Sequence, residues 1–175
     1  MLENSKRFTK GQKIAHDRYG TAQKAKLLVD NPGYSCDNLR LWPGFKEFIE
    51  SRSFFFLASA DSEGRCQCNY RGGEPGFVIV QDDTHLYFPD YDGNGILHTL
   101  GNFIENPHVG LLFIDFDTGV RVKTSGKVTI LDDPDMIRRF RPHAGYQNAL
   151  RIISVQIEYA VPNCSQYLDR VRLSF

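Results

Sequence analysis

The stretch Asn69-Tyr70-Arg71-Gly72-Gly73-Glu74-Pro75-Gly76-Phe77-Val78-Ile79-Val80 lies near the centre of this 175-residue sequence and decides how the chain folds. Glycines and a proline between two strand-forming runs predict a hairpin turn, and Arg71 lies directly before this turn. A second glycine-rich loop, residues 90–95, follows another predicted strand at 85–89. Two such loops beside a cation can hold a phosphate, because backbone N–H groups point into a concavity that no Cβ obstructs. Neither loop has the Walker A or the G-x-G-x-x-G pattern.

The composition is that of one soluble globular domain, with 41% hydrophobic and 24% charged residues. The 21 basic and 21 acidic side chains cancel, which argues against nucleic acid as a partner. Residues 1–7 have no apolar core, so no secretory signal is expected, and no apolar run is long enough to span a bilayer. We therefore expect a cytoplasmic protein without a membrane partner.

The cysteines carry no recognisable metal or disulfide pattern. Cys66 and Cys68 are two apart in a predicted strand, so they lie on one face and do not easily bond to each other. Cys36 and Cys164 have no spacing that suggests a partner, and the histidines add no ligand pattern. Reduced, structural thiols and no metal are expected.

Hydrophobic periodicity predicts seven strands with helices at the edges. Helices are expected at 21–30, from Trp42-Pro43 through Ile49, at 96–105 and at 134–140, whereas residues 1–20 are polar and broken by Gly11 and Gly20. Strands are expected at 54–60, 65–70, 77–80, 85–89, 109–115, 120–131 and 151–158.

The order of these elements predicts a mainly β fold. The turns between successive strands are too short for parallel crossovers, so the sheet is antiparallel. Gly126 inside the long strand indicates a bulge or bend, which favours a closed barrel over a flat sheet. We expect a single domain over 1–175, in which 1–52 form an N-terminal helical extension.

Seven sequence blocks, in order, resemble the pyridoxamine 5'-phosphate oxidase-like flavoproteins, in particular their uncharacterised bacterial branch. The blocks are Phe54-Phe55-Phe56-Leu57-Ala58-Ser59-Ala60-Asp61 with Gly64; Arg71-Gly72-Gly73-Glu74-Pro75-Gly76-Phe77; Phe88-Pro89-Asp90-Tyr91-Asp92-Gly93-Asn94; Thr99-Leu100-Gly101-Asn102; Asn106-Pro107 with Val109-Gly110-Leu111-Leu112-Phe113; Arg121-Val122-Lys123 with Gly126; and Asn163-Cys164.

The resemblance implies an antiparallel Greek-key split β-barrel that forms a homodimer and binds FMN in the clefts between subunits. It implies that the cofactor-binding residues are Asn69, Arg71, Gly72, Phe88, Pro89, Asp90, Gly93, Asn94 and Arg121. Arg121 falls where the relatives place a side chain that hydrogen-bonds the flavin ring. A cation and oriented N–H donors suit a phosphate dianion, and a donor near the ring suits the charge that reduction brings.

The chain departs from the family pattern at the phosphate loop. The relatives usually carry an arginine or lysine after the Gly-Asn pair, whereas this chain has Gly95-Ile96. Arg71 is then the main phosphate cation, with His98, Lys123 and Lys127 in reserve. Residues 161–175 also lack the basic and aromatic side chains of the true oxidase, so we do not expect a pyridoxamine phosphate oxidase.

Two classes of function remain open. The first is an FMN-dependent oxidoreductase that acts on a small molecule stacked on the flavin, without identifiable catalytic residues. The second is a non-catalytic flavin-binding or sensing protein, an interaction module that has lost the cofactor, or a relative that uses haem or a deazaflavin.

Overall fold

The computed structural model describes residues 8–30, 41 and 43–162. It divides the chain into two compact units, Met1–Asn38 and Leu39–Phe175. None of the helices within the described residues has both the length and the apolar character that a membrane crossing requires.

The first unit contains helices α1 (Lys10–Tyr19) and α2 (Ala22–Val29). Helix α2 confirms the helix expected at 21–30. Helix α1 was not expected, because Gly11 was interpreted as a break. The helix begins at a capping box, in which the Thr9 side chain accepts from Gln12 N and the Gln12 side chain accepts from Thr9 N. These two reciprocal bonds satisfy N–H groups at the helix start and outweigh the low helix propensity of one glycine.

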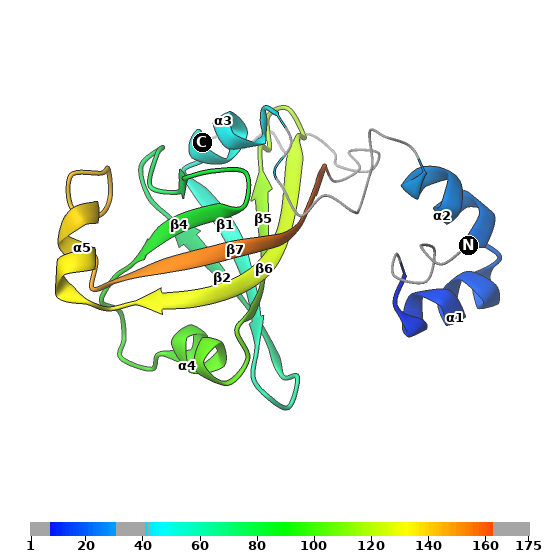
Figure 1. The fold of residues 1–175 in the computed structure, drawn as a ribbon, viewed down its shortest axis with the longest axis horizontal. Coiled ribbons are helices and arrows are strands. Elements are labelled where there is room, and N and C mark those ends of the chain that lie inside the picture. The colour runs from blue at the N-terminus through cyan, green and yellow to red at the C-terminus, as the bar shows by residue number, and fades with distance from the viewer. Residues whose placement is uncertain (1–7, 31–40, 42, 163–175) are drawn as a thin grey trace. The chain divides into compact units, whose positions relative to one another are not determined.

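The second unit is a seven-stranded antiparallel sheet with three helices, which confirms the mainly β split-barrel fold (Figure 1). The sheet order is β2-β1-β5-β6-β7-β4-β3. Its elements are α3 (Phe45–Glu50), β1 (Phe54–Ala60), β2 (Cys66–Gly72), β3 (Ile79–Val80), β4 (His85–Asp90), α4 (His98–Glu105), β5 (His108–Ile114), β6 (Arg121–Leu131), α5 (Pro134–Phe140) and β7 (Arg151–Pro162). In Figure 1, α3 lies at one end of the barrel and α4 at the other.

The barrel is split between β2 and β3. Among the described strands, no ladder joins these two, so the strand pairing does not close as a closed barrel would require. Strand β3 has only two residues, because the chain after Gly73 turns toward α3 instead of extending the hairpin. Gly73 N donates to Ser53 O, and Gly76 N donates to Glu50 O. The glycine-rich turn is therefore attached to α3 and to the residue before β1.

Strand β1 runs through the middle of the core, with alternate residues on its two faces. Phe55 and Leu57 are fully buried, and the Phe55 ring lies 5.1 Å from the rings of Phe88 and Phe113. Phe54 and Phe56 are only partly buried on the other face, and Ala58 is exposed. One face of this strand is therefore covered by the core, and the other is only partly covered in the single chain.

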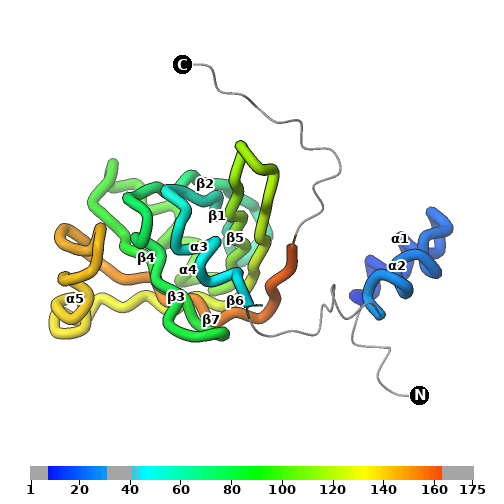
Figure 2. Tube along the Cα trace, turned by 90° about the horizontal axis from the view of Figure 1, so that it is seen from above, coloured from blue at the N-terminus to red at the C-terminus, as the bar shows by residue number. Residues whose placement is uncertain are grey.

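Two long strands, β6 and β7, form the longest pairing of the sheet. The chain reverses direction between them at α5 (Figure 2). The predicted bulge lies between Ser125 and Gly126. A Cβ on Gly126 would overlap the carbonyl oxygen of Gln156, so only glycine fits there. Helix α5 is capped at its start by Asp133, whose carboxylate accepts from Met136 N.

Candidate functional site

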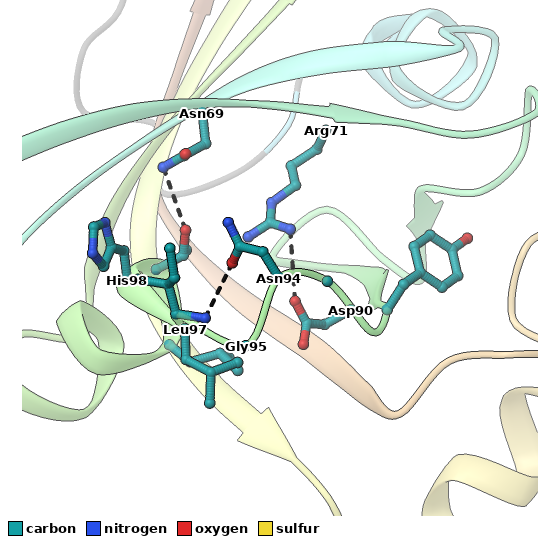
Figure 3. Close-up of a pocket in the computed structure, with 12 residues that line it drawn as sticks. Asn69, Arg71, Asp90, Asn94, Gly95, Leu97 and His98 are labelled. Carbon is teal, nitrogen blue, oxygen red and sulfur yellow. Dashed lines mark hydrogen bonds and ion pairs between the residues drawn. The ribbon is translucent and has the colours of Figure 1, made fainter.

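A pocket of about 310 Å³ opens where the end of β2 faces the segment that connects β4 to α4. Its walls come from three sources: β2, the glycine-rich loop after β4, and the first turn of α4 (Figure 3). The lining residues are Asn69, Arg71, Asp90, Tyr91, Gly93, Asn94, Gly95, Ile96, Leu97, His98, Thr99 and Leu100.

Asn69 and Arg71 reach the pocket because of the register of β2. They pair with Leu57 and Phe55 of β1, so they point to the same side of the sheet as the core. Strand β2 is an edge strand, and α4 and its preceding loop cover this side there. Asn69 Nδ2 donates to Thr99 Oγ1 at 3.3 Å, and Arg71 points toward Asp90 (Figure 3). The sequence thus places one amide and one cation on the pocket wall.

Asp90 is held between two arginines. Its side chain is 7% exposed, and its two oxygens lie 3.6 Å from Arg71 Nη1 and 2.8 Å from Arg151 Nη1. The backbone carbonyl of Asp90 also accepts from Leu150 N at 2.9 Å. A buried carboxylate needs such partners to remain charged. Arg71 Nε is buried, and it has no hydrogen-bond partner among the described residues.

The loop after β4 turns through backbone conformations that glycine favours. Gly95 has φ +75°, and Leu97 has φ +57°, an uncommon value for a residue with a branched side chain. Asn94 Oδ1 accepts from Ile96 N at 3.1 Å and stabilises this turn. The turn directs the start of α4 into the pocket, and α4 therefore begins at His98 instead of residue 96.

The first turn of α4 presents free donors to the pocket. Leu97, the residue before the helix, makes no side-chain capping bond, so among the described residues the N–H groups of this helix start and the positive end of its dipole are available to an anion. His98 Nδ1 lies 3.1 Å from Gln67 Nε2, which orients the imidazole at the pocket wall. Asn102, further along α4, donates to Ser59 Oγ at 2.9 Å in the core and so has a structural role.

Tyr91 closes the pocket on the side of the α5–β7 loop. Its hydroxyl donates to Gly145 O at 2.6 Å. Burial raises the pKa of Tyr91, so the phenol stays protonated and keeps this bond. The bond ties residue 145 to the pocket rim and fixes the loop beside Asp90.

Five of the nine residues predicted for the cofactor line this pocket: Asn69, Arg71, Asp90, Gly93 and Asn94. The other four, Gly72, Phe88, Pro89 and Arg121, do not. Phe88 and Pro89 are buried in the sheet. Gly72 lies on the other side of β2, where the Tyr70 ring occupies the space that a Cβ would need.

Arg121 lies on the face of the sheet opposite to Arg71. In β6 it alternates with the buried Val122 and Thr124, and so it shares the outer side with Lys123. Of the reserve cations, His98 lines the pocket, whereas Lys123 lies near Tyr159 on the outer face and Lys127 pairs with Glu158. One chain therefore cannot bring Arg121 and Arg71 to the same ligand.

The outer face carries a second, apolar concavity of about 400 Å³. Phe56, Ala58, Cys68, Leu112 and Tyr159 are among its lining residues. We call it the outer-face concavity. Cys66 and Cys68 are free and exposed on this side of β2, whereas Cys36 and Cys164 lie outside the described residues. So do residues 163–175, where the true oxidase has its substrate side chains.

Comparison with known proteins identifies the family of this fold. The sequence profile of the family described as pyridoxamine 5'-phosphate oxidase matches residues 41–160. No protein of curated function matches the chain. A candidate pyridoxamine 5'-phosphate oxidase from Lactobacillus delbrueckii is 18% identical, with a TM-score of 0.58 over 71% of this chain and 95% of that chain.

Two further solved structures are similar over most of their length. An F420 reductase is 19% identical, with a TM-score of 0.50 over 72% of this chain and 100% of that chain. An FMN-binding protein from Syntrophomonas wolfei is 10% identical, with a TM-score of 0.50 over 87% of this chain and 97% of that chain. At these identities, the likeness is one of fold.

Proposed function

Because the chain belongs to the pyridoxamine 5'-phosphate oxidase family, we propose that it binds a flavin-type cofactor in the pocket between β2 and α4. FMN is the expected cofactor. The proposed activity is the oxidation or reduction of a small molecule that stacks on the exposed flavin face. The observation that carries this proposal is the convergence of Arg71 and the uncapped start of α4 on one pocket.

The donors of this pocket suit the phosphate end of the cofactor. Arg71 supplies a cation, and its buried Nε has no hydrogen-bond partner among the described residues. Asn94, Gly95 and the first turn of α4 line the pocket beside it and bring backbone N–H groups there, whereas Gly93 N already donates to Asp92 Oδ1. A cation and oriented N–H groups are the combination that binds phosphate in many unrelated proteins. Asn69 and Asn94 add side-chain amides for the polar chain that links the phosphate to the flavin ring.

The size of the pocket supports a site that two subunits share. At about 310 Å³ it lies at the lower end of the range for small-molecule pockets, roughly 300–1,000 Å³. It accommodates the phosphate end of a flavin more readily than the whole molecule. Arg121, on the opposite face, reaches a ligand at Arg71 only if it comes from a second copy. We therefore propose a homodimer in which Arg121 of the partner subunit contacts the flavin ring.

The outer-face concavity is the surface proposed for this dimer. Tyr70 is 63% exposed beside it, and Phe54 and Phe56 are only partly buried. The Phe54 ring stacks on Tyr70 at 5.6 Å and on Phe116 at 6.0 Å, so aromatic side chains continue along this face. Contiguous apolar surface of this kind is typical of protein interfaces.

The residues of this chain bind and orient the cofactor, and the flavin supplies the redox chemistry when bound. Arg71 and the α4 start hold the anionic end, and Tyr91 closes the rim against water. None of the described side chains forms a nucleophile–base pair at the pocket, so no catalytic residue is assigned. The second candidate function is flavin binding or sensing without turnover, and the absence of a cation at Gly95-Ile96 favours it.

The test is a fluorescence titration of FMN and riboflavin into the purified protein, with the oligomeric state measured by light scattering. We expect saturable binding, one flavin per subunit, by a dimer of twice the 20.0 kDa chain mass. Ala58→Arg places a charge in the outer-face concavity and is expected to abolish both the dimer and flavin binding. Ile104→Arg, at a position 77% exposed on α4, is the control and leaves both unchanged. A monomer that binds flavin normally would contradict the shared site.

A further inference from the structure

We infer that Arg151, which does not line the pocket, is a positioning residue that keeps Arg71 free to bind the phosphate of a ligand. This inference rests on the proposed function and deepens it at the same site. Arg151 acts by holding the carboxylate of Asp90. Without that hold, Asp90 draws the Arg71 guanidinium into an ion pair and away from the ligand.

The register of the sheet places Arg151 beside Asp90. The two residues are direct cross-strand partners in the β4–β7 ladder, and side chains in such positions lie close together. Arg151 Nη1 donates to Asp90 Oδ2 at 2.8 Å, and the side chains are 25% and 7% exposed. The bond from Leu150 N to Asp90 O fixes the backbone further. This pair is a short charge-assisted bond that the strand frame itself maintains.

Arg71 is paired with the same carboxylate much more loosely. Arg71 Nη1 lies 3.6 Å from Asp90 Oδ1, which is longer than a hydrogen bond. Arg71 Nε is buried and has no hydrogen-bond partner among the described residues. Because a guanidinium carries five N–H donors, Arg71 keeps donors for a ligand although it stands beside a carboxylate.

The two arginines therefore compete for one buried carboxylate. A carboxylate as buried as Asp90 is costly unless a cation compensates it. Arg151 provides this compensation from outside the pocket. When Arg151 is removed, Arg71 is the remaining cation beside Asp90 among the described residues. Its guanidinium is then expected to close onto both carboxylate oxygens, a geometry that arginine favours. Donors engaged in that pair are lost to a ligand.

The first experiment titrates FMN and riboflavin into Arg151→Gln. We expect the affinity for FMN to fall by about tenfold, within the range that double-mutant cycles give for residues of one ion-pair network. Riboflavin has no phosphate, and its affinity should not change. Arg52→Gln is the matched control, because Arg52 Nη1 lies 2.8 Å from Asp115 Oδ2, its side chain is 22% exposed and it does not line the pocket. This control is expected to leave the ratio of FMN to riboflavin affinity constant.

A second set of variants tests whether Arg151 acts through Asp90. Asp90→Asn removes the charge for which the arginines compete, so it is expected to raise the FMN-to-riboflavin ratio. Adding Arg151→Gln to Asp90→Asn should then have little effect on the ratio, because no buried carboxylate remains to draw Arg71. Arg151→Lys keeps a cation and an N–H donor for Asp90 and is expected to retain most of the FMN affinity. A purely structural Arg151 would instead weaken both flavins, whether or not position 90 carries a charge.

Thermal melts without ligand test the same competition. Arg71→Ala alone is expected to lower the melting temperature little, because Asp90 keeps its bond to Arg151. In the Arg151→Gln background, the same change removes the remaining cation beside Asp90 among the described residues and should lower the melting temperature clearly more. Strictly additive losses would show that the two arginines do not share the carboxylate, and would overturn the inference.

The outcomes separate this inference from the proposed function. An unchanged FMN-to-riboflavin ratio in folded Arg151→Gln overturns the inference while flavin binding stands. An equal fall of the ratio in the Asp90→Asn background also overturns it. If neither flavin binds the unmodified protein, the proposed function fails, and the role given to Arg71 falls with it. Should Arg151→Gln not fold, Asp90→Asn decides the question, because a ratio below that of the unmodified protein would show that Asp90 supports phosphate binding instead of competing with it.

Discussion

Arg71 and Asp90 face each other across the candidate pocket, with Arg71 Nη1 3.6 Å from Asp90 Oδ1. Arg71 comes from β2, one edge strand of the sheet, and Asp90 from the end of β4, which lies next to the other edge strand, β3; the split lies between the two edges. The ion pair therefore bridges the split where strand pairing is missing. It orients the Arg71 guanidinium toward the loop after β4, and it also reduces the positive charge that Arg71 offers to a ligand.

Arg71→Ala is expected to weaken FMN binding by about 2 kcal/mol, the scale for loss of a partly buried charged hydrogen bond. Riboflavin lacks the phosphate and should lose little. Fluorescence titration of both ligands measures the difference. The fold should survive, because Asp90 keeps its bond to Arg151. Equal losses for both flavins would show that Arg71 supports the fold and not the phosphate.

A cation restored at position 96 should tighten FMN binding. Ile96 is 60% exposed and lines the pocket. Ile96→Arg is expected to gain about 1–2 kcal/mol through a charge-assisted bond, and the gain should shrink in high salt. Ile96→Gln is the uncharged control. Titrations at low and high salt measure the effect, and no gain at low salt would place the phosphate elsewhere.

Gly95→Arg, the substitution that the sequence alone suggests, is expected to be a poorer choice. Gly95 has φ +75°, so a side chain there costs about 1–2 kcal/mol of stability. A thermal melt without ligand measures this cost. A melting temperature equal to that of the unmodified protein would contradict the strain.

Gly126→Ala is expected to destabilise the barrel by about 3 kcal/mol. Its Cβ would overlap Gln156 O and reach within 3.1 Å of Ile157 Cα, and both atoms belong to the backbone of β7. Overpacking against backbone costs more than overpacking against a mobile side chain. Gly101→Ala in α4, where nothing lies within 4 Å of the new Cβ, is the control. Urea unfolding compares the two, and equal stabilities would mean that the bulge relaxes freely.

Tyr146→Phe is expected to leave stability unchanged or to raise it by up to about 1 kcal/mol. The Tyr146 hydroxyl is buried without a hydrogen-bond partner among the described residues, and burial raises the pKa of this phenol. Removing an unpaired buried polar group removes its desolvation cost. Tyr91→Phe deletes the 2.6 Å bond to Gly145 O and should cost about 1 kcal/mol. A lower melting temperature for Tyr146→Phe than for Tyr91→Phe would contradict this account.

Most of the fold could be predicted because periodicity is a local signal. The strand expected at 54–60 is β1 to the residue, and the bulge at Gly126 lies where an interior glycine indicates it. Helix α1 was missed because Gly11 was given more weight than the Thr9–Gln12 capping box, which is visible in the sequence. The shortness of β3 could not be predicted from local propensity. The hairpin ends because the turn makes backbone hydrogen bonds to Ser53 and Glu50.

The candidate site could be predicted only in part. Arg71 and the glycine-rich loop were identified from their own sequence, whereas the pairing of Asp90 with Arg151 joins residues 61 positions apart through the register of β4 and β7. His98 was identified only as a reserve cation. A glycine-rich loop that leads into a predicted helix is the signal that could have placed the helix start in the pocket.

The central claim is that a flavin-type cofactor binds between β2 and the start of α4. A crystal structure of the protein with FMN bound tests it most directly. The account predicts that the phosphate contacts Arg71 and the first N–H groups of α4, and that the ring extends toward Arg121 of the partner subunit. A flavin bound in the outer-face concavity, or a phosphate remote from Arg71, would contradict it.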